Sequence, residues 1–338
     1  MHTVNYIIEN RYIVYNNVIG EGNSKIYLGK DLKNNYKVAI KQIYYSESNI
    51  KLIEKEIEIL NKINHKNIIK LLDYVFYNEF VYLIFEYCDG GDLYKYKFNK
   101  NENTIKLIYI QITKGLIYLK NMNIYHHDIK PHNILIKNGI IKIADFGFAN
   151  NFNFICGSPL YMAPELFKLK KFTNKSDIWS LGIILYSLLN DNLPYNLSKC
   201  KNIKDIIKSF TNQLVFYNNN ISEEVKKFLE SILTIDYNKR ADWDTLLKNS
   251  WIIPKNNINI PKNNINIDKN NINIDKNNIN INIDNSICFY ILNTPVFNNY
   301  FISQKVNIKT SPHPIYKSNS IKNKKKKNIF KYTFLSSI

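Results

Sequence analysis

The strongest constraint on the fold comes from a short stretch near the middle of the chain. There a carboxylate, a cation and an amide follow one another at offsets of two and five residues. Two apolar runs come next, separated by an Asn-Gly dipeptide that favours the tight turn of a β-hairpin. Because a hairpin reverses the chain, the Asp-Phe-Gly sequence that follows is expected to return to the same place. The residues concerned are Asp128, Lys130, Asn133, the turn Asn138-Gly139, and Asp145.

This stretch resembles the catalytic loop and the metal-binding segment of eukaryotic-type Ser/Thr protein kinases. The resemblance implies that Asp128 orients the substrate hydroxyl and accepts its proton, and that Lys130 neutralises charge on the transferred phosphoryl group. It also implies ATP as the phosphoryl donor and Mg2+ held by Asn133 and Asp145. Phosphoryl transfer asks the protein mainly for positioning and charge stabilisation. The loop alone also occurs in small-molecule kinases, so other segments must decide between the two classes.

A second segment separates protein kinases from small-molecule kinases. Residues Cys156–Glu165 resemble the substrate-docking segment of Ser/Thr protein kinases. Together with Asp145–Ala149, their sequence is similar to that of the autophagy-initiating kinases. By resemblance, Lys130 favours Ser and Thr over Tyr, which implies protein substrates with Ser or Thr hydroxyls. Glu165 is expected to be buried and to need a partner, because an unpaired buried carboxylate costs several kcal/mol. Arg240 supplies that partner by resemblance, as one of only two arginines in the chain.

The first part of the chain resembles the small lobe of the same family. A strand from Tyr12 to Val18 leads into a glycine-rich loop, where missing side chains let backbone N–H groups approach phosphates. This loop is one residue shorter than usual, lacks an aromatic tip, and has Ser24 in place of a third glycine. A lysine on the following strand would bind phosphates and pair with a glutamate on the next helix. The implied nucleotide-binding residues are Ile19, Gly20, Gly22, Ile26, Ala39, Lys41, Glu56, Glu86, Cys88, Asp92 and Leu135.

The activation segment lacks the features of a phosphate-controlled kinase. His127 stands where the family commonly has an arginine, which clamps a phosphate with a bidentate geometry that histidine cannot copy. Between Gly147 and Gly157 there is no Ser, Thr or Tyr that could be phosphorylated. We therefore expect a kinase that is not switched on by phosphorylation of this segment.

Together these motifs predict an α+β, bilobal protein-kinase-like fold, with a small β-rich lobe that holds one helix and a larger, mostly helical lobe. The predicted kinase domain spans residues 12–251, with the small lobe at 12–88 and the large lobe at 89–251. Residues 252–338 contain a seven-residue repeat rich in Asn, Ile and Lys. Such a composition is typical of a low-complexity spacer, so this tail is expected to be largely disordered.

The tail also holds much of the excess positive charge. The net charge is +18, and the tail contributes 13 Lys against 3 Asp. Its cluster Lys324–Lys327 could contact a partner or an acidic surface, or act as a nuclear signal, and a solvated run at a disordered end explains it equally well. No apolar run approaches the roughly 20 residues of a membrane span. We expect an intracellular, cytoplasmic protein without a transmembrane segment, and nothing indicates its oligomeric state.

Two other functions compete with an active kinase. A pseudokinase, meaning a nucleotide-binding scaffold without transfer activity, is favoured by the shortened glycine-rich loop and by His127. Against it stands the presence of all five expected polar residues, Lys41, Glu56, Asp128, Asn133 and Asp145. A nucleic-acid-binding protein is suggested only by the charge of the tail. It predicts salt-sensitive binding that disappears when residues 252–338 are removed.

Overall fold

A computed structural model of the chain describes residues 3–22, 24–150, 157–169, 172–195, 205, 209, 214–216 and 220–253. The chain divides into two units, Met1–Thr294 and Pro295–Ile338, and every described residue belongs to the first. Several sequence predictions lie outside the described residues. They concern residues 151–156 of the activation segment and the tail from residue 254 onward with Lys324–Lys327.

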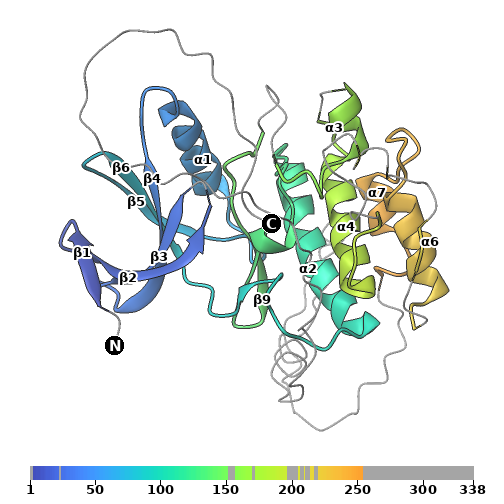
Figure 1. The fold of residues 1–338 in the computed structure, drawn as a ribbon, viewed down its shortest axis with the longest axis horizontal. Helices are drawn as coiled ribbons and strands as arrows, with labels where there is room; N and C mark the ends of the chain where they lie inside the picture. Colours follow the sequence, from blue (N-terminus) through green and yellow to red (C-terminus); the bar gives the residue numbers. More distant parts are fainter. Residues whose placement is uncertain are drawn as a thin grey trace, which may run out of the picture. The chain divides into compact units, whose positions relative to one another are not determined.

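The N-terminal part contains a six-stranded antiparallel sheet (Figure 1). The strand order is β1-β2-β3-β4-β6-β5. Strand β1 lies before the predicted domain start at Tyr12, and only Ile8 is buried within it, which explains why its periodicity does not reveal it. The strands are β1 (Val4–Ile8), β2 (Tyr12–Glu21), β3 (Lys25–Asp31), β4 (Tyr36–Tyr44), β5 (Leu71–Tyr77) and β6 (Phe80–Glu86).

Helix α1 (Ile50–Lys62) covers one face of this sheet. Its buried residues Ile53 and Ile57 form a cluster with Val81 and Leu83 of β6. Neighbouring residues of a strand point to opposite faces, so Ile84 of the same strand belongs to the separate cluster on the other face. The sheet is therefore buried on both faces in its centre, and the register of β6 fixes which face receives α1.

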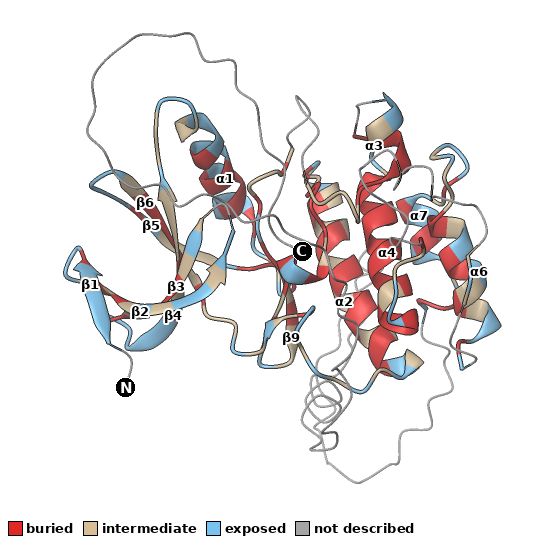
Figure 2. Cartoon of the chain, viewed as in Figure 1, coloured by how far each residue is buried: buried red, intermediate tan, exposed pale blue. Residues whose placement is uncertain are grey.

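The C-terminal part is mostly helical. Helix α4 lies beside α2 and α6 (Figure 1), and all of its residues except Ser187 are buried, as Figure 2 shows in red. An almost uninterrupted apolar sequence is what such a central helix requires. The helices are α2 (Glu102–Asn121), α3 (Pro164–Leu169), α4 (Ser176–Asn190), α6 (Glu223–Ile232) and α7 (Trp243–Leu247).

A second, three-stranded sheet carries the predicted hairpin. Its strands are β7 (Gly91–Asp92), β8 (Ile134–Lys137) and β9 (Ile140–Ile143), in that order. The turn between β8 and β9 uses Asn138 and Gly139 with φ of 47° and 73°, the left-handed conformations that the Asn-Gly dipeptide favours. The predicted hairpin and the predicted α+β fold class are thus confirmed. No helix in the described part of the chain has both the length and the apolar character needed to cross a membrane.

Candidate active site

Lys41 on β4 links two acidic side chains from distant parts of the chain. Its Nζ lies 2.8 Å from Glu56 Oε1 on α1 and 3.2 Å from Asp145 Oδ1 after β9. Burial alone would lower the pKa of Lys41, but the two carboxylates outweigh burial and hold this pKa above its ordinary value. The charge of Lys41 in turn lowers the pKa of Asp145. The predicted lysine–glutamate pair is formed, and Asp145 is joined to it.

Asp128 is the centre of a second polar group. Its Oδ2 accepts a hydrogen bond from Asn133 Nδ2 at 3.0 Å and lies 3.0 Å from Lys130 Nζ. Its Oδ1 accepts a bond from the backbone N–H of Ser158 at 2.8 Å. Lys130 Nζ also donates to Ser158 Oγ at 2.8 Å. Three separate partners therefore hold a carboxylate whose side chain is only 2% exposed.

The backbone of this loop is fixed from the large helical core. Asp177 at the start of α4 accepts hydrogen bonds from the backbone N–H groups of His126 and His127, at 2.9 and 3.0 Å. The imidazole of His126 packs on Phe146, with ring centroids 4.9 Å apart, and its Nε2 lies 3.0 Å from the carbonyl oxygen of Ala144. The loop that carries Asp128 is thus attached directly to the segment that carries Asp145.

Gly157 fits closely against the same loop. Its φ is +107°, and a Cβ added there would lie 2.6 Å from the carbonyl oxygen of His127 and 3.4 Å from Asp128 Oδ1. Both the conformation and the close approach require glycine. This glycine therefore lets the start of the substrate-docking segment lie directly beside Asp128.

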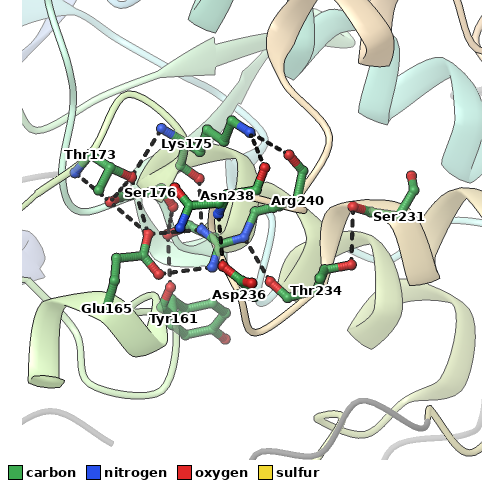
Figure 3. A network of polar contacts seen from close by, with 11 residues as sticks. Tyr161, Glu165, Thr173, Lys175, Ser176, Ser231, Thr234, Asp236, Asn238 and Arg240 are labelled. Carbon is green, nitrogen blue, oxygen red and sulfur yellow. Dashed lines mark hydrogen bonds and ion pairs between the residues drawn. The ribbon is translucent and has the colours of Figure 1, made fainter.

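Glu165, at the end of that segment, pairs with Arg240 as predicted. Arg240 Nη1 and Nη2 donate to the two carboxylate oxygens of Glu165, each at 2.8 Å, as Figure 3 shows. Thr173 Oγ1 and Ser176 Oγ also donate to Glu165 Oε1, each at 3.2 Å. The planar fork of an arginine matches a carboxylate in a way that lysine cannot, which accounts for the choice of arginine at this position.

The predicted nucleotide-binding residues of β2, β3 and β4 lie next to Lys41. Ile26 pairs with Lys41 across β3 and β4, and with Gly20 across β2 and β3. Ile26, Ala39 and Leu135 are each half-buried apolar side chains. A Cβ added at Gly22 would meet nothing within 4 Å, and the backbone N–H of Gly22 donates to Ser24 O at 3.2 Å. The shortened loop is thus a tight hairpin with an open surface at Gly22; Ile19 beside it is 42% exposed.

Glu86 is the last residue of β6, and Cys88 lies in the link that follows it. The carboxylate of Glu86 is bound by Lys137 at 2.9 Å and by Lys142 at 2.8 Å. Burial would raise the pKa of Glu86, but these two lysines outweigh it and lower the pKa. Burial raises the pKa of the Cys88 thiol to about 12, so this thiol is neutral. The side chain of Glu86 is therefore fully engaged within the protein, and its backbone N–H also donates to Lys70 O at 3.2 Å.

Asn133 and Asp145 fit a magnesium ion. Asn133 uses its Nδ2 to bind Asp128, and its Oδ1 makes no hydrogen bond to any described residue. Asp145 binds Lys41 through Oδ1 only, and its side chain is 44% exposed. Both residues can offer an oxygen, the ligand atom that Mg2+ prefers, and such sites often complete their shell with substrate phosphates. Among the described residues, no group of three or more His, Cys, Asp or Glu forms a metal site on its own.

One more predicted residue, Asp92, and two residues that were not predicted, Lys55 and Asn150, also make contacts between these segments. Asp92 pairs with Leu135 across β7 and β8, and one oxygen of Asp92 accepts a bond from Lys95 N at 2.9 Å. Sequence reasoning did not identify Lys55 and Asn150, which join α1 to the segment after Asp145 through a 2.7 Å hydrogen bond. The only local indication in the sequence is that asparagine tolerates the left-handed backbone conformation found at Asn150. That preference does not indicate which residue Asn150 would contact.

Known proteins match this chain over the region just described. Residues 13–252 match the family model described as protein kinase domain. The chain is 36% identical over 258 residues to the serine/threonine-protein kinase atg1 of Dictyostelium discoideum, which covers 69% of this chain and 38% of that protein. It is 40% identical over 209 residues to the serine/threonine-protein kinase ATG1b of Arabidopsis thaliana, and this match covers 56% of this chain and 29% of that protein. It is 37% identical over 241 residues to cell division control protein 7 of Schizosaccharomyces pombe, and this match covers 68% of this chain and 22% of that protein.

The chain thus spans less than half the length of each of these three relatives. The matches confirm the resemblance to Ser/Thr protein kinases, and the names atg1 and ATG1b agree with the wording of the activation segment. The family model covers more than half of the chain. It begins at Ile13, the second residue of β2, and ends at Ile252, which is buried after α7. This chain belongs to the protein kinase domain family.

Proposed function

We propose that this protein is a Ser/Thr protein kinase that transfers the γ-phosphate of ATP to Ser and Thr hydroxyls of protein substrates. The observation that carries this proposal is the pair of assembled polar groups, Lys41 with Glu56 and Asp145, and Asp128 with Lys130 and Asn133. A pseudokinase would be expected to lack at least one of these side chains or contacts. We further propose residues 12–251 as the catalytic domain.

Asp128 and Lys130 would act on the reacting groups. The carboxylate of Asp128 is fixed by Ser158 N and Asn133, so it can accept the proton of a substrate hydroxyl without first reorienting. Lys130 lies 3.0 Å away, where its ammonium can stabilise charge that develops on the transferred phosphoryl group. Mg2+ held by Asn133 and Asp145 would neutralise charge on the phosphates of ATP.

The nucleotide would lie on the residues around Lys41. Lys41 would bind its phosphates, and the backbone of the hairpin at Gly20 and Gly22 would approach them closely. The apolar residues Ile19, Ile26, Ala39 and Leu135 would cover the adenine, the backbone of Glu86 and Cys88 would bind its edge, and Asp92 would contact the ribose.

We also infer that activity does not depend on a phosphate in the activation segment. The His127 ring is buried and stacks on Phe172, with centroids 3.7 Å apart and planes 9° apart. A ring in this position cannot provide the planar, five-donor fork with which arginine binds a phosphate. Protein treated with a phosphatase is expected to keep its activity, and a large loss would contradict this inference.

The direct test of the proposed function compares the wild type with Asp128→Asn. Both proteins are incubated with labelled ATP, Mg2+ and a generic Ser/Thr protein substrate. The wild type is expected to transfer label to Ser and Thr, and the variant to lose about a hundredfold or more in kcat, the scale of a lost general base. A wild type that binds Mg-ATP but transfers no label would establish the pseudokinase instead.

A further inference from the structure

Asn150, five residues after Asp145, uses all of its polar groups to join three segments of the chain. Its Oδ1 accepts a hydrogen bond from Tyr125 N at 2.8 Å, and its Nδ2 donates to Asn123 O at 3.2 Å. Its backbone N–H donates to Tyr125 O at 2.9 Å. Its carbonyl oxygen accepts a bond from Lys55 Nζ of α1 at 2.7 Å. One residue therefore ties the activation segment to the start of the catalytic loop and to α1.

The backbone conformation explains why asparagine suits this position. Asn150 has a φ of +52°, and Asn123, to which it donates, has a φ of +56°. Asparagine adopts this left-handed region more readily than most other residues. Substitution by most other side chains would therefore remove two hydrogen bonds and also strain the backbone that presents the carbonyl to Lys55.

The contact with Lys55 bears directly on the ion pair of Lys41 and Glu56. Lys55 immediately precedes Glu56 on α1, and successive residues of an α-helix are about 100° apart around its axis. The helix rotation that buries Glu56 beside Lys41 thus also fixes the position of the exposed Lys55. A bond from Lys55 to Asn150 resists any rotation or withdrawal of α1 that would separate Glu56 from Lys41.

The contacts of this arrangement involve no phosphate and no hydroxyl group that a kinase could phosphorylate. Its cation binds a backbone carbonyl, its central side chain is a neutral amide, and the nearby ring of His127 is stacked on Phe172. We propose that Lys55 and Asn150 form a permanent clamp that holds α1 in its active position, in place of a phosphate on the activation segment. The proposal rests on the proposed kinase function, and it makes both residues positioning residues that act through Glu56 and the catalytic loop.

The first test replaces Lys55 on the surface of α1, where a folding defect is not expected. Lys55→Met should lower kcat about five- to tenfold, the scale of one solvent-exposed intramolecular hydrogen bond, with little change in the KM for ATP. Lys55→Arg keeps the donor and should restore most of the activity. Lys51→Met is the matched control, since Lys51 is exposed on the same helix, one turn away, and binds no other described side chain.

Hydrogen exchange provides a readout that a simple surface role would not change. In Lys55→Met the backbone amides of α1 should exchange faster than in the wild type, while those of α4 stay unchanged. Asn150→Gly keeps the left-handed backbone and the carbonyl but removes both side-chain bonds, so it should lower kcat and speed exchange in α1 as well.

The outcomes separate this proposal from the proposed function. If the wild type transfers phosphate, and Lys55→Met matches Lys51→Met in both kcat and α1 exchange, the clamp is wrong and the kinase assignment stands. If the wild type transfers nothing, the kinase assignment fails. Exchange in α1 then still decides whether Lys55 and Asn150 hold this helix.

Discussion

The ion pair of Arg240 with Glu165 joins segments 75 residues apart, and the bond of Lys41 to Asp145 joins segments 104 residues apart, but only the first of these contacts is fully enclosed in the protein. Arg240 and Glu165 are 0% and 1% exposed and bind each other through two parallel bonds. Lys41 divides its ammonium between Glu56, 6% exposed, and Asp145, 44% exposed. A charge that is fully buried among its partners holds the fold, whereas a charge with an exposed partner can also bind a ligand.

The closed pair is complete down to its backbone partners. Arg240 Nε donates to Thr234 O at 3.0 Å, and Nη1 donates to Lys175 O at 3.1 Å. The indole ring of Trp179 lies 4.9 Å from the guanidinium carbon and covers its face. Four of the five N–H donors of Arg240 are thus bonded and its side chain is 0% exposed, which agrees with a structural role for the only buried arginine of the described chain.

Arg240→Met is expected to have the largest effect on stability. Removing the guanidinium leaves Glu165 buried without its partner, and breaking a buried pair in this way costs about 3–5 kcal/mol of unfolding free energy. Urea denaturation of both proteins measures the difference. Replacing Glu165 with Leu in the same variant should recover part of the loss, because both charges are then absent. A loss below about 1 kcal/mol in the single variant would show that the pair is not structural.

Lys41→Met should show the opposite pattern. We expect about a hundredfold loss of kcat, because the phosphates lose a cation positioned in the site. The free energy of unfolding should fall by less than in Arg240→Met, because the buried Glu56 loses a single ammonium contact, whereas Glu165 loses a bidentate guanidinium, and Asp145 is 44% exposed and can be solvated. Steady-state kinetics and urea denaturation measure the two effects. Equal losses of stability in the two variants would remove the distinction between a closed and an open pair.

The same contrast shows what could be read from the sequence. The residues of the catalytic loop and the hairpin after it lie close together in the chain, so their spacing predicts that they also lie close together in the fold. They are Asp128, Lys130, Asn133 and the hairpin that leads to Asp145. Arg240 could be predicted because nearly all other cationic residues of the chain are lysines, so an arginine indicates a position that requires its planar fork.

The contacts that could not be predicted join residues whose meeting depends on the packed fold. Lys55 binds Asn150, 95 residues away, and Arg11 binds Asp73, 62 residues away. No local pattern marks either pair. Strand β1 was also hidden, because an edge strand with a single buried residue has little hydrophobic periodicity.

Arg11 offers an intermediate case, since its guanidinium is shared and partly exposed. It binds Asp31 at 3.1 Å and Asp73 at 2.9 Å, and its side chain is 35% exposed. Arg11→Met should cost only about 1 kcal/mol of unfolding free energy, because water and salt compete for the exposed side of the pair. Denaturation at low and high salt should show a difference that shrinks with salt for this variant and persists for Arg240→Met. A salt-independent loss at Arg11 would place it with the closed pair.

The smallest expected effect is the pH dependence contributed by Asp31. Burial opposes its ionisation, but the hydrogen bonds from Arg11 and Asn34 outweigh burial, and the pKa of Asp31 lies below its ordinary value. A carboxyl whose pKa is lower in the folded state contributes its full stability above the unfolded pKa, about 3.9. That contribution is lost as the pH falls through the folded pKa. Asp31→Asn should therefore be less stable than the wild type at pH 7 by under about 1 kcal/mol, and the gap should narrow as the pH falls below about 4. Urea midpoints measured from pH 7 to pH 3 test this, and a gap that widens in acid would mean that the Arg11 bonds do not stabilise the ionised carboxylate.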